Sequence, residues 1–312
     1  PPRSTLDRSS AASDVYKRQS QGEYVFDHGW ADAFERAGGR YYPKMQVSVP
    51  FTPATGPRLL LRAGAAANNE EVAALQGALL STCIRCTDKI GASSLHMTFP
   101  DEGEVELMQK AGLLLRTGIQ FHWDNDDYDS FNNFLESLAS RKRKQIRRER
   151  REALTAGLSI RALSGNDIQE HHWDAFFHFY QDTSSRKWGM PYLTREFFSL
   201  LGQSMGDQVV LVIAENAGRP IAGALNLMSN HTLYGRNWGA VEYHKFLHFE
   251  LCYYQAIDFA ISHQLASVEA GAQGPHKIQR GYSPAYTYSA HWIRDRGFHE
   301  ALERYLEAER QE

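Results

Sequence analysis

The densest group of residues with chemical potential lies in one glycine-rich segment, Gly271 to Tyr282, which reads GAQGPHKIQRGY. Gln273, His276, Lys277 and Arg280 fall within eight positions of one another. Guanidinium and ammonium groups bind phosphate or carboxylate, and an imidazole can exchange a proton near neutral pH. A solvated polar loop has a similar composition. The tyrosines that follow, beginning with Tyr282, favour a shaped site, so we predict an anion-binding loop with His276 as a catalytic group.

A second candidate lies at the expected start of a long helix, in the sequence LHFE. His248 and Glu250 are two positions apart and share a face only if the chain is extended there. Glu250 would suit a general base for an amine nucleophile. A carboxylate that stabilises the positive end of the helix dipole explains it equally well. We predict His248 and Glu250 as catalytic residues, with that alternative open.

Three further motifs are less specific. YGRNWG places Arg236 and Trp238 on an expected strand before that helix; Arg236 is a candidate anion ligand, and Trp238 is either a substrate contact or core. FDHGW offers Asp27, which a helix N-cap also explains. SRKWGMPY, around Arg186, either covers a ligand or forms a surface turn. Cys83 forms a C-x-x-C pair with the residue three positions on, which the expected helix surface explains better than zinc does, so we predict no metal.

Eight basic residues stand between Arg141 and Arg151, in RKRKQIRRERR. They are expected to surround the whole helix rather than to form a stripe. A solvated helix between two lobes is slightly favoured, and contact with RNA or anionic lipid is the alternative. tRNA is therefore a candidate partner of this helix.

Composition limits the functional class. The 312 residues are 42% hydrophobic and 23% charged, with a net charge of −3 and a pI near 6.5. These values fit a globular protein with two modest cores and argue against a nucleic-acid binder over its whole surface. No apolar run reaches the roughly 18 residues of a membrane helix. No signal peptide is visible, and three cysteines form no disulfide framework, so we predict a cytoplasmic protein.

The expected elements divide the chain into four parts. Residues 1–19 lack apolar periodicity and resemble adapter-derived translation, so we predict a non-native or disordered tail. Residues 20–127 show strands at 44–50, 57–62, 93–99 and 118–123 with two helices, which predicts a first α/β lobe. A single helix is expected over 128–156. Residues 157–312 are expected to form a second lobe with helices at 168–182 and 249–263 and a three-strand meander at 208–239.

A meander followed by a helix and a parallel strand is the order of the GNAT acyltransferase fold. Three segments carry a more specific resemblance: YVFDHGWADAFERAGGRYYPKMQVSVPFTPATGPRLL, LHFELCYYQAIDFAI and GAQGPHKIQRGYSPAYTYSAHW. They resemble a bacterial family of N-acyltransferases described as peptidoglycan biosynthesis or recognition proteins, related to the Fem aminoacyl transferases. The resemblance implies two GNAT-like lobes, the first truncated at its N-terminus, and transfer of an acyl or aminoacyl group to an amine, for example of a lipid-linked peptidoglycan precursor.

One departure from the GNAT pattern concerns the donor. GNAT enzymes that use acetyl-CoA hold the pyrophosphate with a glycine-rich loop before the long helix. The corresponding segment here, EYHKFLHFELCYY, contains no glycine. The donor is therefore left as acyl-CoA or aminoacyl-tRNA. Two other functions stay open: a non-catalytic binding module for a cell-wall precursor or anionic lipid, and an RNA-binding accessory protein.

Overall fold

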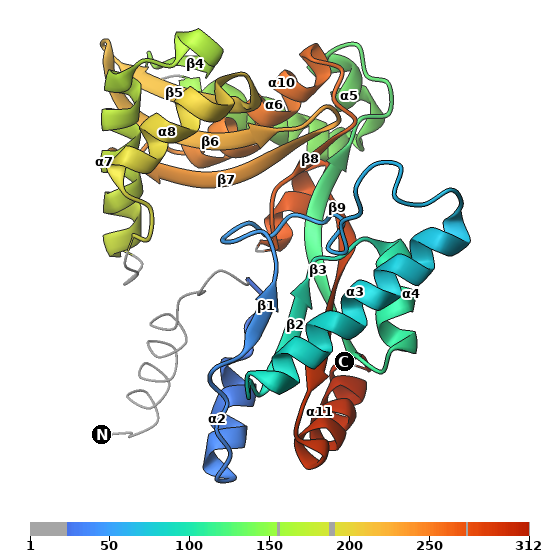
Figure 1. Ribbon diagram of the computed structural model, residues 1–312. Helices are drawn as coiled ribbons and strands as arrows, with labels where there is room; N and C mark the ends of the chain where they lie inside the picture. The colour runs from blue at the N-terminus through green and yellow to red at the C-terminus, as the bar shows by residue number, and fades with distance from the viewer. Residues whose placement is uncertain (1–23, 155–156, 187–190, 273, 312) are drawn as a thin grey trace, which may run out of the picture. The chain divides into compact units, whose positions relative to one another are not determined.

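The computed structural model describes residues 24–154, 157–186, 191–272 and 274–311 (Figure 1). The tail predicted at 1–19 and the candidate ligand Gln273 lie outside this part of the chain. The described residues form two units. Residues 120–285 make the larger unit, and residues 24–119 together with 286–311 make the smaller one.

The larger unit is built on a mixed sheet in the order β3-β8-β7-β6-β5-β4. Strands β4 to β7 form the predicted antiparallel meander, β8 runs parallel to β7, and β3 is antiparallel to β8. The strands are β3 (Leu114–Asp124, of which residues 120–124 belong here), β4 (Ser159–Ser164), β5 (Val209–Asn216), β6 (Arg219–Met228), β7 (Thr232–Ala240) and β8 (Ser267–Glu269).

Alternating side chains of β5 divide the core between the two faces of this sheet. Val209, Leu211 and Ile213 pack with α7 (Glu170–Arg186) and α8 (Arg195–Met205), whereas Val210 and Val212 pack on the opposite face. This is the period of two that a strand with both faces buried requires. In Figure 1, α7 and α8 lie on one side of the meander, and α6 and α10 lie on the other.

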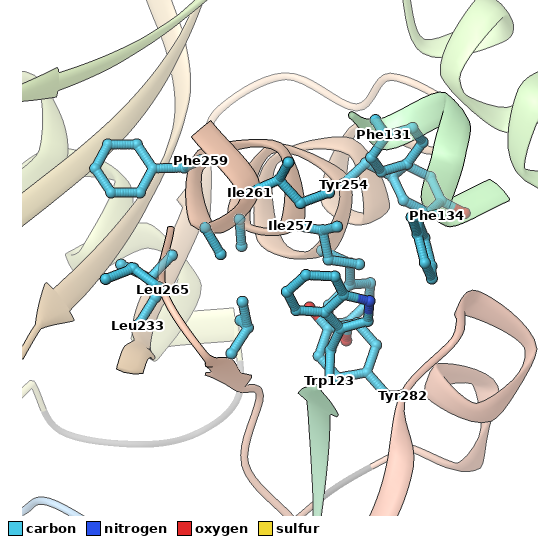
Figure 2. Packing of buried hydrophobic residues seen from close by; sticks show 14 of the residues in the cluster. Trp123, Phe131, Phe134, Leu233, Tyr254, Ile257, Phe259, Ile261, Leu265 and Tyr282 are labelled. Atoms are coloured by element: carbon cyan, nitrogen blue, oxygen red, sulfur yellow. The ribbon is translucent and has the colours of Figure 1, made fainter. Parts of the chain in front are cut away.

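The helix after β7 supplies most of the second face, and the structure divides it into three segments. It begins as α9 (Leu247–Phe249), widens into a π-helix (Glu250–Tyr254) and continues as α10 (Gln255–Ser262). Its apolar side packs on an aromatic cluster that includes Trp123 and Tyr282, as Figure 2 shows. π-Helical turns occur often at functional sites, because they displace the side chains that follow them.

The prediction of a single helix over 128–156 is wrong. Two helices stand there, α5 (Phe131–Ser137) and α6 (Ser140–Leu154), because Leu138 adopts an extended backbone between them. Phe131 and Phe134 of α5 are buried. The break lets the aromatic residues of α5 and the buried residues of α6 contact different parts of the long helix.

The smaller unit contains β1, β2 and β9 as neighbours, with the first half of β3 beside β9. Residues 94–98 of β2 are all buried, and they pair with residues 289–293 of β9. The remaining elements of this unit are α2 (His28–Arg36), β1 (Met45–Val47), α3 (Asn69–Lys89), β2 (Ser94–Thr98), α4 (Glu102–Lys110), β9 (Ser283–Ile293) and α11 (Arg296–Glu309).

One predicted strand of this unit, at residues 57–62, does not form. The buried carboxylate of Glu104 accepts hydrogen bonds from the backbone N–H groups of Arg58 and Leu59, at 2.7–3.0 Å. A side chain from the start of α4 therefore takes the donors that a neighbouring strand would have used.

The predicted lobes and the observed units divide the chain differently. The prediction placed all of 157–312 in one lobe, whereas residues 286–311 belong to the smaller unit. The reason is the pairing of β9 with β2 over five residue pairs. The α/β class and the order of strands and helices agree with the GNAT-like arrangement.

Candidate functional site

A cavity of about 630 Å³ opens in the larger unit where β7 ends and the long helix begins. Two of the predicted site residues, Trp238 and His248, contribute to its wall. Their rings meet edge to face with centroids 5.1 Å apart. The lining comprises Thr183, Arg186, Trp238, Ala240 and residues 242–249.

The wall of this cavity is aromatic and basic, and its charges are partnered. Lys245 forms an ion pair with Glu152 at 2.7 Å, and His244 lies 3.1 Å from Glu242. The imidazole of His248 also meets the ring of Tyr253, at 5.4 Å. The cavity can therefore take a ligand with flat apolar parts. His244 and Lys245 were not predicted as site residues, although both stand in the glycine-free segment that precedes the long helix.

Near Arg236, the pairing of β7 with β6 shifts by one residue and the pairing of β7 with β8 ends. The register of β7 with β6 shifts at this residue, as in a β-bulge, because Asn226 pairs with Gly235 and Leu225 pairs with Asn237. The register of β7 with β8 ends just before it, at Tyr234 opposite Glu269. β-Bulges frequently stand next to active sites, where they redirect side chains.

Beyond that point β8 and β7 separate. Ala270 and Gly271 exchange hydrogen bonds with Phe121 of β3 at 3.0 and 3.1 Å, so the chain after β8 stays with β3. β7 continues beside β6 as far as Ala240. No strand of the described chain therefore pairs with β7 after Tyr234 on its β8 side.

The predicted anion-binding loop folds as a 3₁₀ helix, η4 (Pro275–Arg280), and its two cations point inward. Lys277 is 3% exposed, and its ammonium donates to the backbone carbonyls of Ala270 and Gly271. Burial lowers the pKa of Lys277 to about 8. Lys277 thus fastens the loop to the end of β8.

Arg280 is held in the same way by α6. Its guanidinium donates to both carboxylate oxygens of Glu149, at 2.9 and 3.1 Å, and to the carbonyl of His276 at 2.7 Å. The guanidinium carbon lies 3.5 Å from the ring centre of Phe249. Arg280 and Glu149 are 4% and 2% exposed, so this is a buried ion pair with its donors committed to protein.

His276 and Tyr282 connect this loop to the long helix. The Nε2 atom of His276 lies 3.1 Å from the hydroxyl of Tyr253. Burial, with the charges of Arg280 and Lys277, lowers the pKa of His276. Tyr282 is 2% exposed, and its hydroxyl has no hydrogen-bond partner within the described part of the chain. Its ring therefore belongs to the apolar cluster of Figure 2.

Glu250 is placed less favourably for catalysis than expected. Its side chain has no exposed surface, and it accepts hydrogen bonds from Arg150 at 3.0–3.2 Å and from Gln255 at 2.8 Å. Arg150 also pairs with Asp258 at 2.6 Å. Both oxygens of this carboxylate are committed to the partly buried guanidinium of Arg150, so the position favours a structural role that ties α6 to the long helix.

The basic residues of α6 divide into two sets, and they do not surround the helix evenly. Arg150 turns inward, and so do Lys142 and Arg143, which donate to the carbonyls of Ile278 and Glu136. The other five are exposed and lie along one side, opposite the buried Ile146. We call this set the basic face: Arg141, Lys144, Arg147, Arg148 and Arg151.

In the smaller unit, Asp27 does not cap α2 as the alternative had it. Its carboxylate forms an ion pair with Lys44 at 2.8 Å and accepts a hydrogen bond from the hydroxyl of Tyr41 at 2.5 Å. The network continues to His96, whose Nδ1 atom lies 2.6 Å from Nδ1 of His291. Both imidazoles are buried, and burial lowers their pKa values, that of His96 to about 3.

These two histidines make stability sensitive to acid. Their folded pKa values lie below the unfolded value near 6.5, so their contribution is complete above pH 6.5 and is lost as pH falls towards 3. We expect the two together to remove roughly 3 kcal/mol of unfolding free energy between pH 6.5 and 5. Denaturant titrations at several pH values measure this. His96→Gln should halve the slope, and the exposed His231→Gln should leave it unchanged; equal slopes in all three proteins would contradict the assignment.

No group of three or more His, Cys, Asp or Glu side chains in the described residues is arranged to hold a metal ion. Cys83 and Cys86 lie on α3, half-buried and exposed respectively. Among the helices described, none is both long and apolar enough to cross a membrane.

The meander, the helix that follows it, the parallel β8 and the cavity at their junction define a GNAT-like fold. Comparison with known families agrees: a family profile matches residues 4–312, and the chain belongs to the FemAB-like family, described as peptidoglycan biosynthesis/recognition. The predicted family and fold class are confirmed.

Solved structures support the fold. FemX is 10% identical to this chain with a TM-score of 0.53, and the match covers 74% of this chain and 79% of FemX. L-PGS from Bacillus licheniformis is 10% identical with a TM-score of 0.52, covering 74% of this chain and 78% of that one. No curated protein matches the sequence.

Proposed function

We propose that this protein transfers an acyl or aminoacyl group to an amine, with the donor bound in the cavity and the reacting carbonyl beside the bulge of β7. The observation that carries the proposal is the alignment of three features along one strand. The cavity wall includes Trp238, the bulge is at Arg236, and the separation from β8 begins after Tyr234.

The span of these features suits an extended donor. Trp238 lies four positions after Tyr234 along β7, and a strand of that length spans roughly 13 Å. A donor anchored at Trp238 would lie along the side of β7 that β8 leaves open, and would present its carbonyl near Arg236. Holding the carbonyl and the amine in a fixed geometry can supply a large part of the rate acceleration without any metal.

The predicted residues then divide by role. Trp238 and His248 line the cavity and contact the donor. Arg280 and Glu250 are both buried and ion-paired, to Glu149 and Arg150 respectively, and these pairs hold α6, η4 and the long helix together. Lys277 fixes η4 to the end of β8.

We assign aminoacyl-tRNA as the donor, and the amine of a lipid-linked peptidoglycan precursor as the acceptor. Two observations support the donor. The cavity segment 242–249 carries a side chain at every position, so it lacks the open backbone of a pyrophosphate loop. The basic face of α6 offers five exposed cations to a polyphosphate backbone. The family description, peptidoglycan biosynthesis/recognition, supports the acceptor.

The test is a transfer assay with purified protein, either aminoacylated tRNA or an acyl-CoA as donor, and an amine-bearing precursor. We expect product with the tRNA donor. Trp238→Ala and His248→Ala should each raise the KM for the donor about tenfold or more, because each removes a side chain from the cavity wall. His231→Ala, exposed just before β7, is the matched control and should leave KM unchanged. Tight binding of the precursor without any product would replace transfer by the binding-module function.

A further inference from the structure

Glu269 was not predicted as a site residue, and it is not part of the cavity wall. It is the last residue of β8, and its side chain is 14% exposed. Its Oε2 atom lies 4.0 Å from Nε2 of His122 on the adjacent β3. The same His122 nitrogen lies 3.3 Å from the amide oxygen of the buried Gln120. Glu269 has no arginine or lysine within ion-pairing distance among the described residues, unlike Glu149 and Glu250.

The place of Glu269 in the sheet is also distinctive. It stands opposite Tyr234 at the last pair that joins β7 to β8, immediately before the strands separate. The next residue of β7, Gly235, has no side chain, and a Cβ atom there would lie 3.3 Å from the backbone oxygen of Glu269. β7 therefore approaches β8 closely at this point, and a side chain on residue 235 would meet the backbone of β8 tightly.

We propose that Glu269 is the catalytic proton acceptor of the amine substrate, with His122 as its positioning residue. The assignment rests on the proposed function, since it places the reacting amine where β7 and β8 begin to separate. It gives the transfer a base that is not ion-paired to an arginine, in contrast to Glu250.

The transfer needs only the amine, the aminoacyl ester and the carboxylate of Glu269. The amine nitrogen attacks the carbonyl carbon of the aminoacyl ester and forms a C–N bond. One N–H proton passes to the carboxylate of Glu269. The C–O bond to the donor then breaks, its electron pair goes to the leaving oxygen, and the proton passes from Glu269 to that oxygen. The products are an amide and an alcohol.

The surroundings of Glu269 match this role. Burial raises the pKa of Glu269 to about 7, a value suited to proton exchange at neutral pH. Burial lowers the pKa of His122, and Asp124 opposes that change. The titratable and charged side chains of the paired strands near Glu269 are His122 and Asp124 on β3, with Tyr234 and Arg236 on β7.

The experiment is a pH profile of kcat for the full chain, with aminoacylated tRNA and two acceptor amines of different basicity. A limb that moves with the amine belongs to the substrate. We expect a second limb near pH 7, set by Glu269, that stays in place with both amines. Glu269→Gln should lower kcat by 100-fold or more and abolish that limb. His122→Gln should shift the limb and retain measurable turnover, which a merely structural residue would not do.

A matched control is Glu215→Gln, since Glu215 is a strand residue of similar exposure, 16%, that is ion-paired to Arg161. It should leave the profile unchanged. If Glu269→Gln keeps kcat within threefold of the unaltered protein with the same limbs, the role of Glu269 is overturned while the transferase function stands. If the unaltered protein transfers nothing from either tRNA or acyl-CoA, the proposed function is overturned, and the role of Glu269 with it.

Discussion

Arg280→Met is expected to lower the free energy of unfolding by about 3–5 kcal/mol. The change keeps most of the side-chain volume but leaves the carboxylate of Glu149 buried without its cation. Glu149 would retain only the hydroxyl of Tyr254 and the amide of Gln145, both of which are neutral donors. Removing one member of a buried ion pair costs far more than the pair contributes, because the remaining charge stays desolvated. Denaturant unfolding at pH 7.5 measures the loss.

Two further variants separate this effect from a general sensitivity to losing arginine. Arg161→Met breaks an ion pair whose arginine is 53% exposed, and it should cost less than about 1 kcal/mol. Adding Glu149→Gln to Arg280→Met removes the stranded charge and should recover part of the stability. A single variant within 1 kcal/mol of the unaltered protein would show that Glu149 is solvated in solution.

Reversing the charge of the basic face is expected to weaken tRNA binding by 100-fold or more in low salt. The variant carries Lys144→Glu, Arg147→Glu and Arg151→Glu, all exposed on one side of α6. Each phosphate contact releases bound counterions, so fewer counterions are released when three contacts are lost. The slope of log K against log salt concentration should therefore become shallower by about 2–3 units. Filter binding of aminoacylated tRNA at several salt concentrations measures both quantities.

The matched control changes the net charge by the same amount, but at residues far from α6 in the sequence. Lys110→Glu, Arg296→Glu and Arg304→Glu alter three exposed cations of α4 and α11. This variant should lose only a few-fold in affinity. An equal loss in both variants would mean that tRNA responds to overall charge, and the basic face would then have no specific role.

Much of the fold follows from local patterns in the sequence. Thr194 caps α8 by accepting a hydrogen bond from the backbone N–H of Phe197, and threonine is among the residues preferred at a helix N-cap. The meander predicted at 208–239 begins with an apolar run, which forms β5, and both faces of this strand are buried. The break at Leu138 was not predictable in this way, because helical periodicity continues across it in the sequence. The strand expected at 57–62 failed because Glu104, more than 40 residues away, takes its backbone donors.

The candidate site was predictable only in outline. Trp238 and His248 do line one cavity, and His276, Lys277 and Arg280 do lie together on η4. The direction of the charged groups was not predictable, because it depends on partners distant in sequence. Glu149 is 131 residues from Arg280, and nothing in the motif around either residue indicates the other. Glu269 was missed for the same reason, since its environment comes from β3 and β7.

The division of the smaller unit into two chain segments has a consequence for synthesis on the ribosome. Residues 120–285 are continuous, so the larger unit can fold as soon as they emerge. The smaller unit has to wait for β9, because His291 pairs with a partner 195 residues earlier. Until then β2, all of whose residues are buried in the finished protein, has an unpaired edge where β9 will lie. The interval before β9 is made is therefore when the nascent chain most needs protection from aggregation, and the pairing of β9 with β2 ends it.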